Sequence, residues 1–272
     1  MHRKNGITFI MNENIRINKE LFGFRLGTTS FIYPDNIIPN VKKLGPVFDE
    51  IELLIFESIP SDVLPSKKDI RELASLAREF DLTYNIHLPV DVSLTDASEL
   101  KRKKAIETIL RVADLVSPLE PTTHTLHLDD AGSSSDNDWY QRSFDAAGFL
   151  SQSLGKPEII SIETLEYPFK LVEPIIDEFG FSVCVDAGHL IKYGYDIKVI
   201  FNKYNDKIPL IHLHGVDFKE SPPKDHTSLD KTPSGKFIDT LEVLKSFQGV
   251  VSLEVFNKKN LISSLACLEK LF

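Results

Sequence analysis

The chain has 272 residues, of which 42% are hydrophobic and 26% charged, a composition typical of a globular domain with a sizeable core. Its 40 acidic and 31 basic residues give a formal net charge of −9, which disfavours a dedicated nucleic-acid binder, because such proteins neutralise phosphates with basic surface. The two cysteines, Cys184 and Cys267, lie far apart in apolar patterns, which predicts neither a disulfide framework nor a zinc knuckle.

No stretch reaches the roughly 18 to 20 apolar residues that a membrane-spanning helix needs, and residues 7–11 are too short for the core of a signal peptide. We therefore expect a cytoplasmic protein without a membrane partner. Residues 1–22 show no durable period and are rich in Asn, Lys and Arg, which predicts an N-terminal tail.

Short apolar runs with strand composition recur after the tail, and segments with helical spacing lie between them. The eight runs begin near residues 25, 51, 83, 123, 159, 181, 208 and 250, and the clearest helical segments span 68–80, 97–116, 171–179, 237–247 and 261–271. Alternation of strand and helix is typical of a parallel sheet, and nearly continuous apolar runs suit strands that are buried on both faces. Eight such strands favour a closed barrel.

The alternative fold, an open doubly wound sheet, lacks its usual signature, because the first run ends in Gly27-Thr28-Thr29-Ser30 without a glycine-rich phosphate loop. We therefore predict the α/β class, with a single (β/α)8 TIM-barrel domain over residues 23–272. The stretch 215–234 is predicted as one long irregular loop, and loops of that length are usually functional or disordered.

Histidines and isolated acids recur at the carboxyl ends of the predicted strands, which converge on the catalytic face of a barrel. In chain order they are Glu57, His87, His127, Glu163, Asp186, His189, His212, His214 and Glu254, and the loop after the seventh run adds Asp225 and His226. So many imidazoles and carboxylates would repel one another or stay expensively desolvated without compensating cations. The pattern predicts divalent metal ions such as zinc, manganese or iron, which could activate water against a phosphate ester.

Each of these residues also has a simpler explanation, because a single His or Glu at a strand end is more often a cap or a hydrogen-bonded group than a ligand. Because so many of these residues occur at matching strand ends, a shared functional site is favoured. His124 precedes His127 by three residues, so strand alternation places His124 on the opposite face, in packing or solvent. Glu57 and His214 point to the same mouth and are candidates for substrate contact.

The ligand pattern resembles the xylose isomerase-like TIM-barrel superfamily over residues 24–272. Its one-metal isomerases and epimerases hold an ion with Glu, Asp, His and Glu at strands five to eight, places occupied here by Glu163, Asp186, His212 and Glu254. Its endonuclease IV-like members bind two further ions, and the matching residues are His87, His127, His189 and His226. Asp225 departs from their Asp-x-His pattern because it is adjacent to His226, and it is predicted to contact the substrate instead.

A narrower resemblance rests on short segments: residues 24–30, 52–58, 85–90, 116–121 and 212–216, with Asp225-His226. These are similar to the cobamide-remodelling phosphodiesterase family, which hydrolyses the nucleotide loop of corrinoids and releases the lower-ligand riboside and cobinamide phosphate. The resemblance implies a metal-dependent hydrolase with a small-molecule corrinoid substrate and two or three divalent ions. Its catalytic residues would be Glu163, as bridging ligand, with Glu254, His189 and His226.

The alternative function is a sugar or sugar-phosphate isomerase or epimerase with a single divalent ion. In that case Glu163 and Glu254 also move protons at carbons that flank a carbonyl, and His87 and His127 only face the substrate. Repair of abasic DNA ranks third, because the chain offers few basic or wedge-like loops, and a non-enzymatic binding barrel ranks last. The sequence leaves the oligomeric state open.

Overall fold

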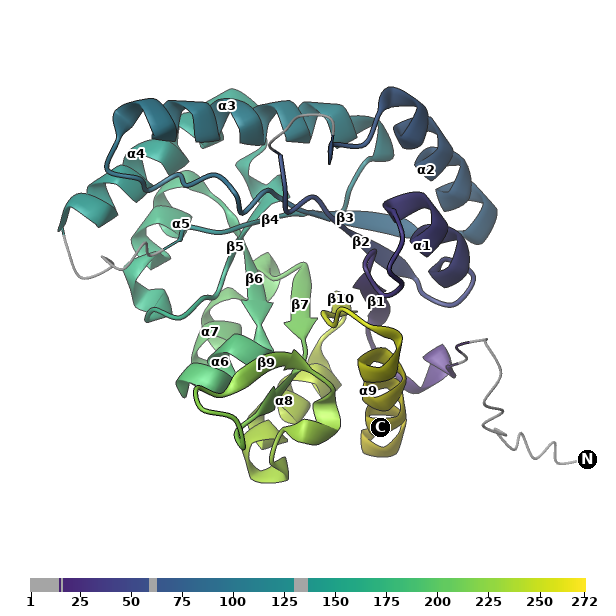
Figure 1. Ribbon diagram of the computed structural model, residues 1–272. Helices are drawn as coiled ribbons and strands as arrows, with labels where there is room; N and C mark the ends of the chain where they lie inside the picture. Colours follow the sequence, from purple (N-terminus) through teal and green to yellow (C-terminus); the bar gives the residue numbers. More distant parts are fainter. Residues whose placement is uncertain (1–14, 16, 59–62, 130–136) are drawn as a thin grey trace, which may run out of the picture.

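A computed structural model describes residues 15, 17–58, 63–129 and 137–272, and these form a closed barrel of eight parallel strands with helices on its outside (Figure 1). In barrel order the strands are β1 (Arg25–Thr29), β10 (Val250–Leu253), β7 (Leu210–Leu213), β6 (Ser182–Asp186), β5 (Ile160–Glu163), β4 (His124–Leu126), β3 (Thr83–His87) and β2 (Glu50–Leu54). Each strand lies on one of the apolar runs of the sequence. The predicted (β/α)8 TIM barrel is confirmed.

The helices occupy the segments between the strands. They are α1 (Ile37–Leu44), α2 (Lys67–Phe80), α3 (Glu99–Val116), α4 (Asn137–Leu154), α5 (Glu173–Phe179), α6 (Ala187–Tyr193), α7 (Ile197–Tyr204), α8 (Ser234–Ser246) and α9 (Lys258–Leu271). The ends of α2 show how local sequence sets these bounds. Ser66 and Asp69 form a reciprocal capping box at its start, and Asp81 ends it in the left-handed conformation, with φ 51°.

The predicted tail, residues 1–22, falls mostly outside the described residues. Of its described part, Ile15 is buried and Ile17 packs against the barrel core. The division into a tail and one domain stays a prediction. Within the described part of the chain, no helix combines the length and the apolar character needed to cross a membrane.

The stretch 215–234, predicted as a loop, instead contains an antiparallel hairpin of β8 (Gly215–Asp217) and β9 (Lys224–Thr227). Its strands are three and four residues long, too short for their alternation to be recognised in a sequence. Gly215 is required at the start of the hairpin, because a Cβ atom there would lie 2.0 Å from the backbone oxygen of Ser228. The hairpin matters for function because it carries Asp225 and His226.

Glu50, on β2, shows how the barrel accommodates a buried acid. Its carboxylate accepts hydrogen bonds from Thr83, Asn85 and Thr122, and Arg25 Nη1 lies 3.5 Å away. Burial raises the pKa of Glu50 even so, because these bonds only partly offset the loss of water. Both carboxylate oxygens of Glu50 are satisfied within the fold, so this acid needs no external ligand.

His124, on β4, is buried, with 4% of its surface exposed, and burial lowers its pKa to about 4. An unfolded histidine titrates near 6.5, so between about pH 6.5 and 4 the unfolded chain binds a proton that the folded chain does not. Stability contributed by neutral His124 is therefore present above this window and is lost as the pH falls through it. We expect this loss to reach roughly 3 kcal/mol at the acid end.

The measurement is urea unfolding of the wild type and of His124→Gln, which cannot titrate, across this pH range. The difference in unfolding free energy between the two proteins should shift in favour of the variant as the pH falls. A difference that stays constant from pH 7 to pH 4 would show that the pKa of His124 in the folded protein equals that of an unfolded histidine.

Candidate active site

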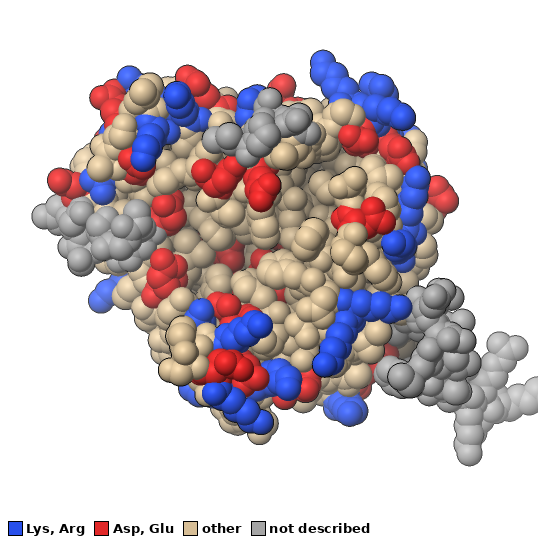
Figure 2. Space-filling model, in the orientation of Figure 1, with Lys and Arg blue, Asp and Glu red and all other residues tan. Residues whose placement is uncertain are grey.

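A cavity of about 340 Å³ opens at the carboxyl ends of the strands, and acidic side chains are visible at the bottom of this hollow (Figure 2). Its lining consists of Phe56, His87, Val90, His127, Glu163, His189, His226, Glu254 and Phe256. The volume is near the lower end of the range for small-molecule sites, about 300–1,000 Å³. The cavity therefore suits a ligand the size of a single sugar.

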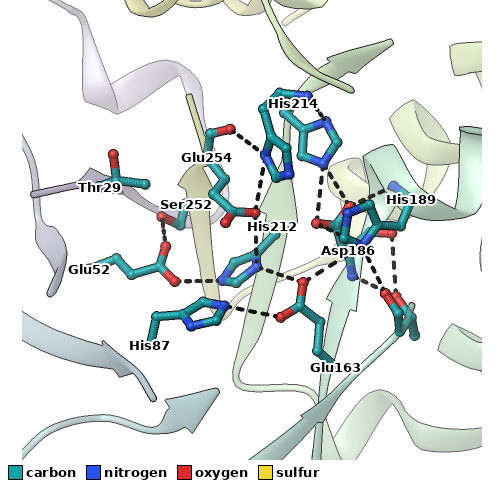
Figure 3. Close-up of polar contacts among 12 residues, drawn as sticks. Thr29, Glu52, His87, Glu163, Asp186, His189, His212, His214, Ser252 and Glu254 are labelled. Atoms are coloured by element: carbon teal, nitrogen blue, oxygen red, sulfur yellow. Dashed lines mark hydrogen bonds and ion pairs between the residues drawn. The ribbon is translucent and has the colours of Figure 1, made fainter. Parts of the chain in front are cut away.

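Glu163, the last residue of β5, lies at the centre of the polar cluster (Figure 3). Its Oε2 atom is 2.7 Å from Nε2 of His127 and 3.4 Å from Nε2 of His87, and its Oε1 atom is 3.3 Å from Nδ1 of His212. Burial alone would raise the pKa of Glu163, but His127 and His212 lower it well below its ordinary value. Glu163 is therefore ionised, and its two oxygens face different histidines.

Four buried side chains form a compact set of potential ligands: Glu163, Asp186, His212 and Glu254. Each offers one ligand atom, and these atoms all lie within 4.8 Å of one another. Strand register brings two of them together, because Asp186 on β6 is paired with His212 on β7. Glu254 directly follows β10, and its Oε2 atom is 3.3 Å from Nδ1 of His212.

This set fits a divalent cation. Three carboxylates and one imidazole converge there, and the cavity lining of the described residues includes no Lys or Arg to balance their charge. Oε2 of Glu254 is buried and has no hydrogen-bond partner among the described residues, which is costly without a ligand. Oxygen and imidazole donors without a thiolate suit manganese, zinc, iron or magnesium.

The sequence Asp186-Ala187-Gly188-His189 builds the neighbouring part of the site. The Asp186 carboxylate accepts a hydrogen bond from the backbone N–H of His189 at 2.7 Å and so caps helix α6. Its other oxygen is 3.2 Å from Nε2 of His214. Gly188 allows this approach, because a Cβ atom there would lie 2.0 Å from the His214 ring.

His226, on β9, completes a group of three histidines with His189 and His214, whose ligand atoms also lie within 4.8 Å of one another. Its backbone has a left-handed φ of 47°, and its N–H donates to Nδ1 of His214 at 3.1 Å. A left-handed backbone is uncommon for a non-glycine residue, and here it accompanies the bond between the His226 N–H and His214. Its neighbour Asp225 accepts a hydrogen bond from Lys192 Nζ at 2.5 Å.

The predicted metal ligands all belong to one of these clusters: His87, His127, Glu163, Asp186, His189, His212, His226 and Glu254. The three residues predicted to contact substrate have different surroundings in the structure. Glu57 is exposed and outside the lining, His214 is fully buried against Asp186, and Asp225 pairs with Lys192 on α6. The chemical role of each residue stays a prediction.

Several residues of the site were not predicted from the sequence. Phe56, Val90 and Phe256 line the cavity, and Glu52 is buried beside His212. Glu52 had a readable signal, since it is an acid inside an otherwise apolar run. Phe256 also had a readable signal, because it lies two residues after Glu254.

Solved structures of similar fold include a D-tagatose 3-epimerase-like protein, with a TM-score of 0.70 and 18% identity over 91% of this chain and 97% of that one. D-psicose 3-epimerase with D-tagatose from Clostridium cellulolyticum H10 gives a TM-score of 0.69 and 13% identity over 91% and 98% of the two chains. L-ribulose 3-epimerase gives 0.67 and 15% over 89% and 86%. At such identities the likeness shows the fold. A search of curated protein sequences finds no match.

The predicted cobamide phosphodiesterase function is wrong: these similar structures are named for sugar epimerases, which favours the isomerase or epimerase alternative. The segments that carry the narrower resemblance also have a structural role in the barrel. For example, the Thr28 and Thr29 hydroxyls donate to the backbone oxygens of Leu253 and Val255 at 3.1 and 3.0 Å. Segments that close the barrel do not specify a corrinoid, and a 340 Å³ cavity suits a smaller substrate.

The family model named xylose isomerase-like TIM barrel matches residues 38–271, which is most of the chain. The match covers the strands and loops that carry the four-residue ligand set. The chain therefore belongs to the xylose isomerase-like TIM barrel family.

Proposed function

We propose that this protein is a metal-dependent isomerase or epimerase of sugars, which moves a proton at a carbon next to a carbonyl group. The observation that carries the proposal is a pair of buried carboxylates, Glu163 and Glu254, that line one cavity with Nδ1 of His212 3.3 Å from each. In the barrel, β6 and β7 separate β5, which ends in Glu163, from β10, which Glu254 directly follows, so the acids approach the cavity from different sides. The names of the structurally similar epimerases support the same reaction class.

One divalent cation would be held by Glu163, Asp186, His212 and Glu254. When bound, it supplies electrophilic stabilisation of the negative charge that proton removal places on the sugar's oxygens. The sequence-based expectation of two or three ions, zinc or manganese, stays a prediction. Further ligand atoms are offered by the groups His87, His127, Glu163 and His189, His214, His226, and elemental analysis of the purified protein counts the ions.

The two carboxylates supply the proton transfers. Epimerisation removes a proton from one face of a carbon and returns a proton to the opposite face, which needs a group on each side. Burial opposes ionisation of Glu254, but His212 and His226 lower its pKa, as His127 and His212 lower that of Glu163. Both acids are therefore ionised and able to accept a proton from the substrate carbon.

Other lining residues would orient the sugar. His87 and His127 present ring nitrogens beside Glu163, where they can bind sugar hydroxyls. Phe56 and Phe256 form an apolar wall, with ring centroids 6.2 Å apart, that can contact the C–H face of a sugar and exclude water. The lining thus combines a polar floor with an aromatic side.

The test is incubation of protein loaded with Mn²⁺ or Co²⁺ with a panel of ketopentoses, ketohexoses and their phosphates, followed by chromatographic separation of the epimers. We expect interconversion of at least one pair of sugars, abolished by a chelator and restored by added metal. Hydrolysis of a chromogenic phosphodiester, with no sugar in the panel converted, would contradict the proposal.

A further inference from the structure

Glu52 lies on β2, two residues after Glu50, and is fully buried beneath the metal-ligand set. Its Oε2 atom accepts a hydrogen bond from the Ser252 hydroxyl at 2.8 Å, and its Oε1 atom is 2.9 Å from Nε2 of His212 (Figure 3). Strands β1 and β10 separate β2 from β7 in the barrel, so the contact between Glu52 and His212 crosses the barrel interior. Glu52 therefore reaches the ring of a proposed ligand from the side opposite Glu163.

The contact between Glu52 and His212 leaves polar atoms without hydrogen bonds. Oε1 of Glu52 and Nε2 of His212 are both buried and lie 2.9 Å apart as an ion pair, without a hydrogen bond between them. Neither atom has another hydrogen-bond partner among the described residues. A carboxylate buried in this way is costly unless it acts on the imidazole, since burial without a partner removes the hydration of the charge. Glu50 differs, because both of its oxygens are hydrogen-bonded.

The two nitrogens of His212 face different groups. Nδ1 lies 3.3 Å from both Glu163 Oε1 and Glu254 Oε2, on the side of the ligand set, whereas Nε2 faces Glu52. A histidine that binds a metal through one nitrogen commonly donates its other N–H to a carboxylate, which fixes the tautomer and the ring orientation. Glu52, His212 and the ligand set lie in the same order, with Glu52 Oε1 2.9 Å from His212 Nε2.

We propose that Glu52 is a positioning residue that holds His212 with its proton on Nε2 and its Nδ1 atom directed at the cation. The inference rests on the metal site of the proposed function. Ser252 is part of the same arrangement, because its hydroxyl anchors the second oxygen of Glu52.

The experiment measures the affinity of metal-stripped protein for Co²⁺, from the visible absorption of the bound ion in competition with a chelator. Glu52→Leu removes the acceptor, Glu52→Gln retains a neutral acceptor, and Glu50→Gln is the matched control on the same strand. We expect Kd to rise about 10- to 100-fold for Glu52→Leu, less for Glu52→Gln, and to stay within about threefold of wild type for Glu50→Gln.

A second readout is long-range ¹H–¹⁵N NMR of the Zn²⁺-loaded protein, which reports the state of each histidine nitrogen. Wild type should show His212 metallated at Nδ1 and protonated at Nε2, and this state should lose population in the Glu52 variants but not in Glu50→Gln. If Glu52→Leu does not fold, the comparison of the two Gln variants decides. Co²⁺ affinity and a His212 signal unchanged in the Glu52 variants would overturn the role of Glu52 alone, whereas a wild type that binds no Co²⁺ would overturn the metal site and the proposed function with it.

Discussion

Replacing Glu163 by Gln is expected to lower the rate of sugar epimerisation by at least about a thousandfold while the barrel stays folded. General acid–base groups contribute about 10²- to 10⁴-fold, and this change also removes a negative ligand from the metal set. The amide is nearly the same size as the carboxylate, so packing around β5 is preserved. The measurement is the turnover rate of metal-loaded protein on the sugar that wild type converts, beside a thermal melt followed by circular dichroism.

The matched control is Glu178→Gln, which removes a carboxylate from the exposed surface of α5 and should leave turnover unchanged. A Glu163→Gln protein that is folded, loaded with metal and as active as the control would exclude Glu163 from proton transfer. Glu254→Gln is expected to behave as Glu163→Gln does, because its carboxylate lines the same cavity and contacts the same His212 nitrogen.

Binding of a divalent cation is expected to raise the melting temperature by roughly 5 to 10 °C when the ion is present at about 100 times its Kd. This concentration stabilises the folded state by about 2.7 kcal/mol, and each kcal/mol corresponds to about 2–4 °C for a chain of this size class. The physical cause is relief of the repulsion among the buried carboxylates of Glu163, Asp186 and Glu254. Differential scanning calorimetry of stripped and reloaded protein measures the shift.

Two comparisons make this result specific to the ligand set. Asp186→Asn and Glu163→Gln should each show a smaller shift with the same ion, whereas Glu178→Gln should show the full shift. A melting temperature that does not respond to Mn²⁺, Co²⁺, Zn²⁺ or Mg²⁺ would contradict a metal site in this barrel.

The barrel strands and the five predicted helices, which correspond to α2, α3, α5, α8 and α9, were readable because their signals are local. The buried parallel strand β10 has three apolar residues of four, and α2 has both the helical period and the Ser66 capping signal. The hairpin of β8 and β9 was not readable, since its short strands are held by pairing with each other and by the fit of Gly215 against Ser228. Such contacts between segments leave no period in the sequence.

The residues of the site also differ in how readily the sequence predicts them. The convergence of the predicted site residues was predictable because the carboxyl ends of barrel strands meet, so that an acid or histidine at each end lies near the others. Glu52 was missed because its importance depends on a contact across the barrel interior with His212. The substrate was mispredicted because short segments such as 24–30 reflect the closure of the barrel, whereas the cavity that selects a substrate is assembled from side chains such as Phe56 and Phe256.

The most direct measurement of the proposed reaction is ¹H and ¹³C NMR of candidate ketoses incubated with metal-loaded protein in D₂O. Proton removal by one carboxylate and return from the other predicts both a new sugar epimer and solvent deuterium at the carbon next to the carbonyl. Wild type should show both changes, whereas Glu163→Gln and Glu254→Gln should form no epimer. Unchanged sugars without deuterium in folded, metal-loaded wild type, across the whole panel of ketoses and their phosphates, would contradict the assignment of this barrel to sugar isomerisation or epimerisation.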